Sequence, residues 1–278
     1  ICCRLGWDSP AAEMADILNR LCMPTELEGH TLICRVPSFR DDVEGRADLA
    51  EEVMRVYGYS HIVGTPMTGQ VVRGRLLPER RMTDKVKSLL IAQGAQEIVT
   101  YSFISGRAAD QLGLAPDDPR RQAVTLLNPL GEEYSTMRTQ LLSSMLTVLS
   151  TNLNRKIPAA RFFEASKLFL PRSLPLTELP DEVPALSLGL YGEKEDFFTL
   201  KGLVETLAEG FGVKVDYTRS AEPYLHPGRQ ARAAVGEETL AVFGELHPDT
   251  AARYGLEDRI YVGEVRLAPL FAARKAAV

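Results

Sequence analysis

Residues that build common metal and redox centres are scarce in this sequence. Its 278 residues include only four cysteines and four histidines. Neither set has the spacing of a zinc site, which excludes the zinc-finger and zinc-ribbon classes. The sparse cysteines favour an intracellular, reduced protein. They are Cys2, Cys3, Cys22 and Cys34.

Long hydrophobic runs are also absent. No segment approaches the roughly 18 apolar residues that a membrane-spanning helix needs, and no signal peptide is recognisable. We therefore expect a cytoplasmic protein. The chain begins with Ile-Cys-Cys and not with Met, which predicts a fragment excised from a longer protein.

Positive charge is in short supply. The chain has 32 Lys and Arg against 37 Asp and Glu, a net charge of −5. This balance argues against broad electrostatic binding of nucleic acid, because phosphate contacts need a basic face. The sequence has no P-loop and no GxGxxG run, so the common phosphate-cradling loops are excluded.

The pattern along the chain predicts two domains and a linker. Residues 1–68 contain a helix at 10–21, a strand at 31–36 and a helix at 48–57, which together resemble a small, helix-rich winged-helix module. Glycine and proline then mark a linker at 69–78. Nearby arginines form a basic patch that we interpret as a solvated face of the linker, and contact with tRNA or a partner is the alternative. These are Arg73, Arg75, Arg80 and Arg81.

The second domain, residues 79–278, has an α+β pattern. An amphipathic helix at 79–93 is followed by a strand at 96–103 and later by a helix at 141–153. Many strands with few βαβ alternations favour a largely antiparallel sheet with flanking helices. Further strands are expected near 160–170, 185–191, 213–218, 231–235, 239–244 and 260–266.

Acidic residues gather around the start of the helix at 48–57, and two interpretations are open. Asp48 with Glu51 three residues later has the form of a capping box, with Asp48 as N-cap. In that case the acids cap the helix and form a solvated face. Alternatively Asp48, Glu51 and Glu52 share one helical face, with Asp42 in the loop before it. Such oxygen ligands suit Mg2+.

The segment from Val36 to Tyr59 resembles the β subunit of bacterial phenylalanyl-tRNA synthetase. Other motifs follow in the order of that family and extend the resemblance over nearly the whole chain. They are Leu127-Asn128-Pro129-Leu130, Met137-Arg138-Thr139, Leu141-Leu142, Phe163-Glu164 with Phe169, Lys201-Gly202 with Glu205, His226-Pro227-Gly228-Arg229 and Gly244-Glu245-Leu246-His247-Pro248.

The resemblance implies a Mg2+ ion shared with an α subunit. Its ligands in this chain would be Asp42, Asp48, Glu51 and Glu52, while Asp41 stands where the family has an aromatic residue and is not a ligand. It further implies an (αβ)2 heterotetramer that joins phenylalanine to tRNA(Phe) using ATP. Helix 79–93 would then correspond to class II motif 1, the element that forms subunit interfaces.

The same resemblance predicts a class II synthetase-like domain without a working active site. The class uses an Arg two residues before the motif 2 Glu, and aligned on Glu164 that position holds Phe162, while Arg161 faces the other side of the strand. Segment 260–266 lacks the glycine-rich run of motif 3. We therefore expect no catalytic residue here, with ATP bound only by the α subunit. The alternatives are a stand-alone nucleic-acid-binding module or an enzyme with an unrecognised site.

Three side chains that resemble site residues have structural interpretations. We interpret Arg138 as part of a structural salt bridge, and a contact to phosphate or to a partner helix is the alternative. His226 and His247 each precede a proline, which favours a turn with the imidazole bonded to backbone over a catalytic role.

Overall fold

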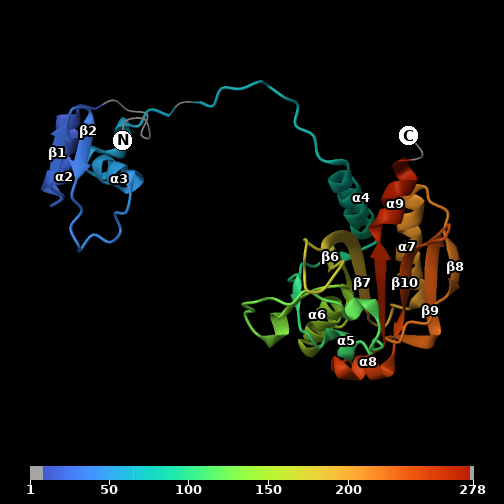
Figure 1. The fold of residues 1–278 in the computed structure, drawn as a ribbon. Helices are drawn as coiled ribbons and strands as arrows, with labels where there is room; N and C mark the ends of the chain where they lie inside the picture. Colours follow the sequence, from blue (N-terminus) through green and yellow to red (C-terminus); the bar gives the residue numbers. More distant parts are fainter. Residues whose placement is uncertain (1–8, 65, 276–278) are drawn as a thin grey trace. The chain divides into compact units, whose positions relative to one another are not determined.

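The computed structural model describes residues 9–64 and 66–275, so Cys2 and Cys3 lie outside the described residues. The chain divides into two compact units, Ile1–Gly74 and Arg75–Val278 (Figure 1). Cys22 and Cys34 carry free thiols. Within the described ranges, no helix is long and apolar enough to cross a bilayer.

In its described residues, 9–64 and 66–74, the first unit has two α-helices and an antiparallel pair of strands around its own small core. Its elements are α2 (Ala11–Arg20), β1 (Thr25–Glu28), β2 (Thr31–Cys34), α3 (Arg46–Tyr57) and a 3-10 turn, η1 (Tyr59–His61). The two strands form an antiparallel hairpin, turned at Gly29 with a φ of 61°. Apolar residues at helical spacing on α2 meet residues of α3 and the loops. The buried members of this core are Met14, Ile17, Leu18, Met23, Val43 and Val53.

The second unit is built on a seven-stranded sheet in the order β3-β6-β7-β11-β10-β9-β8. The neighbouring strands are antiparallel except for β3 and β6, which are parallel. The mixed α+β class with a largely antiparallel sheet is therefore confirmed. The strands are β3 (Gln96–Glu97), β6 (Ala160–Leu170), β7 (Asp181–Tyr191), β8 (Asp216–Arg219), β9 (Leu225–Val235), β10 (Glu238–Leu246) and β11 (Ile260–Arg266).

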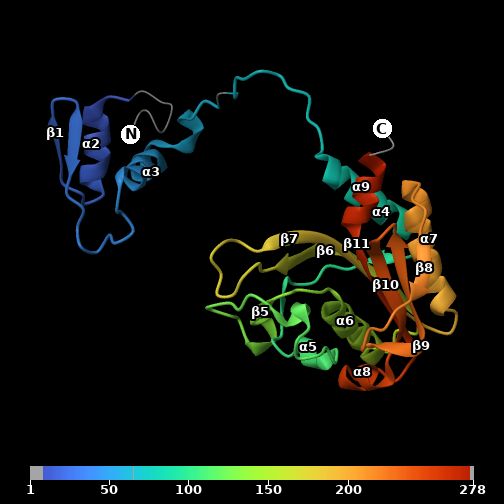
Figure 2. The same cartoon turned by 45° about the vertical axis from the view of Figure 1, so that its right-hand side comes forward.

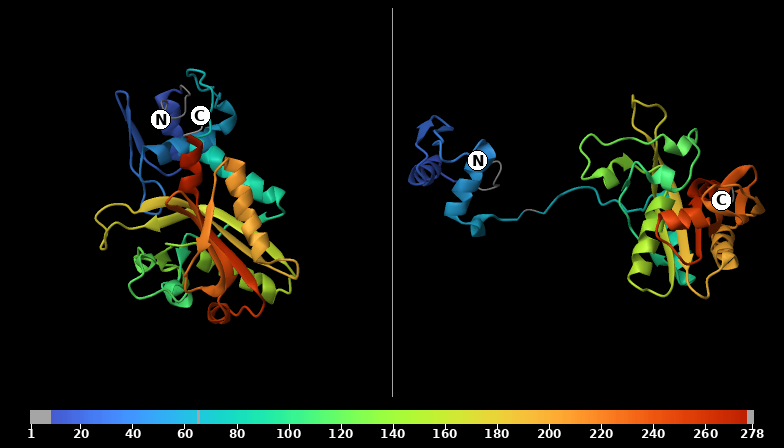
Figure 3. Two further views of the ribbon diagram at one scale, coloured as in Figure 1. Left: turned by 90° about the vertical axis from the view of Figure 1, so that its right-hand side faces the viewer. Right: turned by 90° about the horizontal axis from the view of Figure 1, so that it is seen from below.

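Helices cover both faces of this sheet. On one face lie α4 (Pro78–Ala92), α7 (Phe197–Phe211) and α9 (Leu267–Lys275), which contact one another through α7 (Figure 2). On the other face lies α6 (Leu142–Asn154), with the short helices α5 (Ala108–Gln111) and α8 (Pro248–Arg253) nearby (Figure 3). Each face has its own apolar core. Gly189 of β7 lets α6 approach closely, because a Cβ atom there would lie 2.6 Å from the sulfur of Met145.

The region between α4 and α6 differs from the prediction. The strand expected at 96–103 is wrong: β3 ends at Glu97, and Phe103–Ile104 forms β4, which pairs with β5 (Thr136–Met137) in a separate small sheet. The chain leaves the main sheet because Thr100 bonds to a side chain, donating from its N–H and hydroxyl to the carboxylate of Glu164 at 3.3 and 2.8 Å. The helices α7, α8 and α9 were not predicted.

Candidate functional site

The acidic segment begins α3 in a different register from the one expected. The helix starts at Arg46, with Gly45 as an extended N-cap, so Asp48 is the third helical residue and not the cap. Its Oδ2 atom accepts hydrogen bonds from the backbone N–H groups of Gly45 and Glu44, at 2.7 and 3.0 Å. The prediction of Asp48 as N-cap is therefore wrong. Its carboxylate instead reaches back to N–H groups that precede the first helical turn.

Arg40 draws two of the predicted metal ligands together. Its Nη2 atom lies 2.6 Å from Oδ2 of Asp42 and 3.1 Å from Oε1 of Glu52. Arg55, one turn further along α3, lies 2.8 Å from the other oxygen of Glu52. Hydrogen bonds from Arg55 and Arg40 lower the pKa of Glu52, and the bond from Arg40 lowers that of Asp42. Two carboxylates thus share one cationic nitrogen atom.

The four acids do not form a complete metal site within this chain. Asp48 is bound to backbone, Glu51 is exposed on α3, and only Asp42 and Glu52 meet at a common cation. In residues 9–64 and 66–275, no three His, Cys, Asp or Glu side chains are grouped to hold a metal ion. The Mg2+ site stays a prediction. Sequence reasoning missed Arg40 and Arg55, although their spacing from Asp42 and Glu52 was a usable signal.

A buried ion pair joins the segment that follows β5 to strand β6 of the large sheet. Nη1 of Arg138 lies 2.9 Å from Oε1 of Glu164, and the two side chains are 1% and 3% exposed. Arg138 also donates to the carbonyl of Lys167, to the hydroxyl groups of Thr100 and Ser166 and to the carbonyl of Tyr101. Its donors are used within the fold, so the predicted structural salt bridge is confirmed.

The neighbouring positions on β6 offer no free cation either. Phe162 is 7% exposed and lies in the core beneath α6. Arg161, on the opposite side of the strand, forms an ion pair of 2.8 Å with Glu195 and donates to the carbonyl of Gln93. The alternation of side chains along a strand thus places an aromatic ring where the class places an arginine.

The strand β11, at the position of motif 3, is a packed core strand. Its single glycine, Gly263, allows close packing, since a Cβ atom there would lie 2.7 Å from that of Phe243. Glu264 is half-buried on this strand, and its Oε2 atom accepts from the N–H of Leu141 at 2.9 Å. Burial raises the pKa of Glu264 above the usual value for a glutamate.

Both histidines that precede a proline bond to backbone through the imidazole, as predicted, but the turn expected at His226 is wrong, because His226 and Pro227 lie within β9. Nδ1 of His226 accepts from the N–H of Gly228 at 3.1 Å. Nδ1 of His247 accepts from the N–H of Asp249 at 3.2 Å and so caps α8. Glu245, between the two, forms an ion pair with Arg229.

Comparison with known proteins gives consistent matches over the two units. Residues 62–267 match the family model of the phenylalanyl tRNA synthetase beta chain CLM domain, and residues 1–59 match the tRNA synthetase B5 domain. The phenylalanine–tRNA ligase beta subunit of Clostridium tetani is 38% identical over 269 residues, covering 96% of this chain and 34% of the relative. That of Geobacter metallireducens is 36% identical, covering 92% of this chain and 34% of the relative.

The chain therefore spans about a third of the length of these relatives. A solved structure with a similar fold is pyrrolysyl-tRNA synthetase from Desulfitobacterium hafniense. It aligns with a TM-score of 0.56 at 18% identity, covering 71% of this chain and 69% of that one. At this level of identity the likeness concerns the fold alone.

Proposed function

The chain belongs to the phenylalanyl-tRNA synthetase β-chain family, and we propose that it is the non-catalytic β part of a phenylalanine–tRNA ligase. That enzyme attaches phenylalanine to tRNA(Phe) in the cytoplasm using ATP, which binds at the α subunit. The observation that carries the proposal is the buried Arg138–Glu164 pair beside Phe162. Stabilising charge that develops on a phosphate requires a preorganised cation, and each arginine at this place is already paired.

The outward face of α4 is the proposed contact with the α subunit in an (αβ)2 assembly. The helix buries Met82, Val86 and Leu90 against the sheet. Its other side presents Ser88 and Ile91 to solvent, and Ile91 is 57% exposed. The match of residues 62–267 to the β-chain family, whose motif 1 helix corresponds to α4, supports the role of subunit contact.

The first unit would supply half of a Mg2+ site shared with the α subunit. Asp42, Asp48, Glu51 and Glu52 would hold the ion, and the shared Arg40 nitrogen supports a place where carboxylates meet around positive charge. Mg2+ prefers such oxygen ligands and keeps part of its water shell. Completion of the site would require Arg40 to release Asp42 and Glu52.

We further propose the domain limits 1–68, 69–78 and 79–278, with a winged-helix-like first domain. Support for that shape comes from the α2 and α3 helices beside an antiparallel hairpin. The alternative of a stand-alone nucleic-acid-binding module is not favoured, because the relatives are synthetase β subunits.

The test is ATP–pyrophosphate exchange with each amino acid, first with this chain alone and then with a bacterial phenylalanyl α subunit added. The chain alone should give no exchange, and the mixture should exchange with phenylalanine above the level of the α subunit alone. Exchange by the chain alone with any amino acid would overturn the non-catalytic assignment.

A further inference from the structure

Arg40 contacts two of the four proposed Mg2+ ligands through both edges of its guanidinium group. Its Nε and Nη2 atoms donate to the two oxygen atoms of Asp42 at 2.8 and 2.6 Å. Its Nη1 and Nη2 atoms lie 3.3 and 3.1 Å from the two oxygen atoms of Glu52. Such planar, two-pronged contacts to a carboxylate are among the strong hydrogen bonds of proteins. All four oxygen atoms of the two carboxylates therefore face one guanidinium group.

The charges of this cluster already balance. Arg55 places a second guanidinium group 2.8 Å from Oε2 of Glu52, so two arginines face two carboxylates. The side chain of Arg40 is 20% exposed and that of Glu52 is 10% exposed, so water screens their charges less than it does at an open surface. A divalent cation that approached these oxygen atoms would meet two positive charges already in place, which disfavours its binding.

The other two proposed ligands do not compensate for this. Asp48 uses its Oδ2 atom to accept from two backbone N–H groups, and Glu51 is exposed on α3. Mg2+ keeps several of its waters and typically binds one or two carboxylates, and Asp42 and Glu52 are the two that converge. Their use as ligands therefore requires Arg40 to leave them.

We propose that Arg40 is an internal counter-ion that keeps divalent metal ions off this chain until the α subunit is present. This inference rests on the shared Mg2+ site of the proposed function. In the chain alone, Arg40 holds Asp42 and Glu52 together and so ties the loop before α3 to that helix. In the assembly, Arg40 releases the two carboxylates, and ligands from the α subunit offset the ion pairs that are lost. Arg40 and Mg2+ thus exclude each other.

The test measures Mn2+ binding to the full 278-residue chain without the α subunit. The electron paramagnetic resonance signal of free Mn2+ reports the binding, and Mg2+ is added as the competitor. Arg40→Gln leaves one arginine against two carboxylates, so the variant should bind Mn2+ about tenfold more tightly than the wild type. Mg2+ should displace the ion from the variant. Equal affinity of the two proteins for Mn2+ would overturn the proposal.

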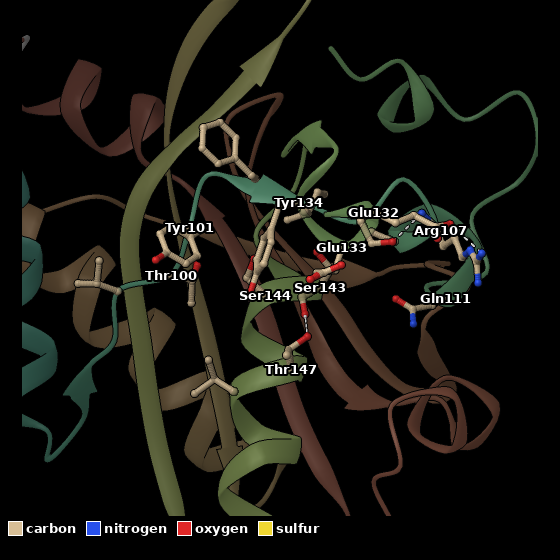
Figure 4. Close-up of a pocket in the computed structure, with 16 residues that line it drawn as sticks. Thr100, Tyr101, Arg107, Gln111, Glu132, Glu133, Tyr134, Ser143, Ser144 and Thr147 are labelled. Carbon is tan, nitrogen blue, oxygen red and sulfur yellow. Dashed lines mark hydrogen bonds and ion pairs between the residues drawn. The ribbon is translucent and has the colours of Figure 1, made fainter. Parts of the chain in front are cut away.

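Arg107→Gln is the matched control, because it also frees a carboxylate from an arginine. Nη2 of Arg107 lies 2.7 Å from Oε1 of Glu132 in an ion pair of the second unit whose two side chains are exposed (Figure 4). This variant should bind Mn2+ as weakly as the wild type. A gain equal to that of Arg40→Gln would mean that any freed carboxylate binds the ion, and it would contradict the proposal.

Two further variants locate the ion and allow for misfolding. Adding Asp42→Asn to Arg40→Gln should abolish the gain in Mn2+ affinity, and a gain that persists would place the ion elsewhere and contradict the proposal. Hydrogen exchange of the α3 amides shows whether Arg40→Gln is folded, and Mg2+ should slow this exchange in the variant but not in the wild type. If Arg40→Gln does not fold, Arg55→Gln takes its place, because Arg55 is half exposed. Its Mn2+ affinity should rise about threefold, and no rise would overturn the proposal.

Addition of the α subunit to the wild-type chain distinguishes failure of this inference from failure of the shared Mg2+ site. If the mixture binds Mn2+ and Arg40→Gln alone shows no gain, the shared site stands and Arg40 is not the group that blocks it. If neither the mixture nor the variant binds Mn2+, the shared site itself is refuted, and this inference with it.

Discussion

Replacing Arg138 by methionine should destabilise the second unit by about 3–5 kcal/mol, because it leaves the buried Glu164 carboxylate without its counter-charge. Glu164 is only 2% exposed, so water cannot replace the lost partner. The hydroxyl and N–H of Thr100 would still donate to it, which keeps the cost below that of an isolated buried charge. Urea unfolding followed by far-UV circular dichroism measures the change.

The double variant Arg138→Met with Glu164→Leu tests whether the Arg138–Glu164 ion pair serves stability or binds a ligand. It removes both charges, so that no buried carboxylate lacks its counter-charge, while the Thr100 hydroxyl and N–H lose their acceptor at a cost of about 1–3 kcal/mol for each unsatisfied buried group. We therefore expect it to be more stable than Arg138→Met alone. A single variant that loses less than about 1 kcal/mol, or a double variant no more stable than the single one, would refute the account of Arg138 as a structural group.

Three further predictions concern packing and pH. Gly244→Ala should lower the free energy of unfolding by about 2–3 kcal/mol, because a Cβ atom would overlap the carbonyl oxygen of Arg229 and lie 2.8 Å from the Cα atom of Gln230. Gly202→Ala on α7, where a Cβ atom would meet nothing within 4 Å, should raise it by about 1 kcal/mol in the same urea assay. Because burial raises the pKa of Glu264, the native state holds the proton of this carboxyl more firmly than the unfolded state, and the free energy of unfolding should fall as pH rises above about 4.3. The urea midpoints at pH 5 and pH 8 should therefore differ less for Glu264→Gln than for the wild type. An equal difference in the two proteins would contradict this cause. The lowered pKa of Glu52 has the opposite effect on the pH dependence of stability. The stabilisation by ionised Glu52 is complete above the pKa of Glu52 in the unfolded chain and is lost as pH falls through its pKa in the folded chain. Acidification from pH 6 to pH 3 should therefore cost the wild type more stability than Glu52→Gln, as measured by hydrogen exchange of α3 amides.

Local patterns in the sequence predicted the elements whose side chains alternate or repeat regularly. The strands at 160–170 and 260–266 match β6 and β11, and the helix at 79–93 matches α4 within one residue at each end. The strand at 96–103 failed because Glu164, far away in the sequence, takes the hydrogen bonds of Thr100. No local pattern contains that contact.

In the candidate sites too, local patterns were predicted correctly and contacts between distant residues were missed. The alternation along the strand was sufficient to predict that Phe162 and Arg161 face opposite sides of the sheet, since Phe162 lies in the core beneath α6 and Arg161 forms an ion pair with Glu195. The start of α3 was misplaced because Asp48 bonds backward to Gly45 instead of forward into the helix, and both directions are compatible with the sequence. The sharing of Arg40 between Asp42 and Glu52 depends on how the loop before α3 folds, which spacing alone does not determine.

We propose that this chain acts as a scaffold for a phenylalanyl α subunit. The most direct test of this proposal is co-elution of the chain with a bacterial α subunit on size exclusion, with and without Mg2+. We expect a complex that Mg2+ strengthens and that Ile91→Arg on α4 weakens, while the control Ile157→Arg, at a residue 42% exposed outside α4, has no effect. A complex indifferent both to Mg2+ and to Ile91→Arg, or no complex under any condition, would contradict the account.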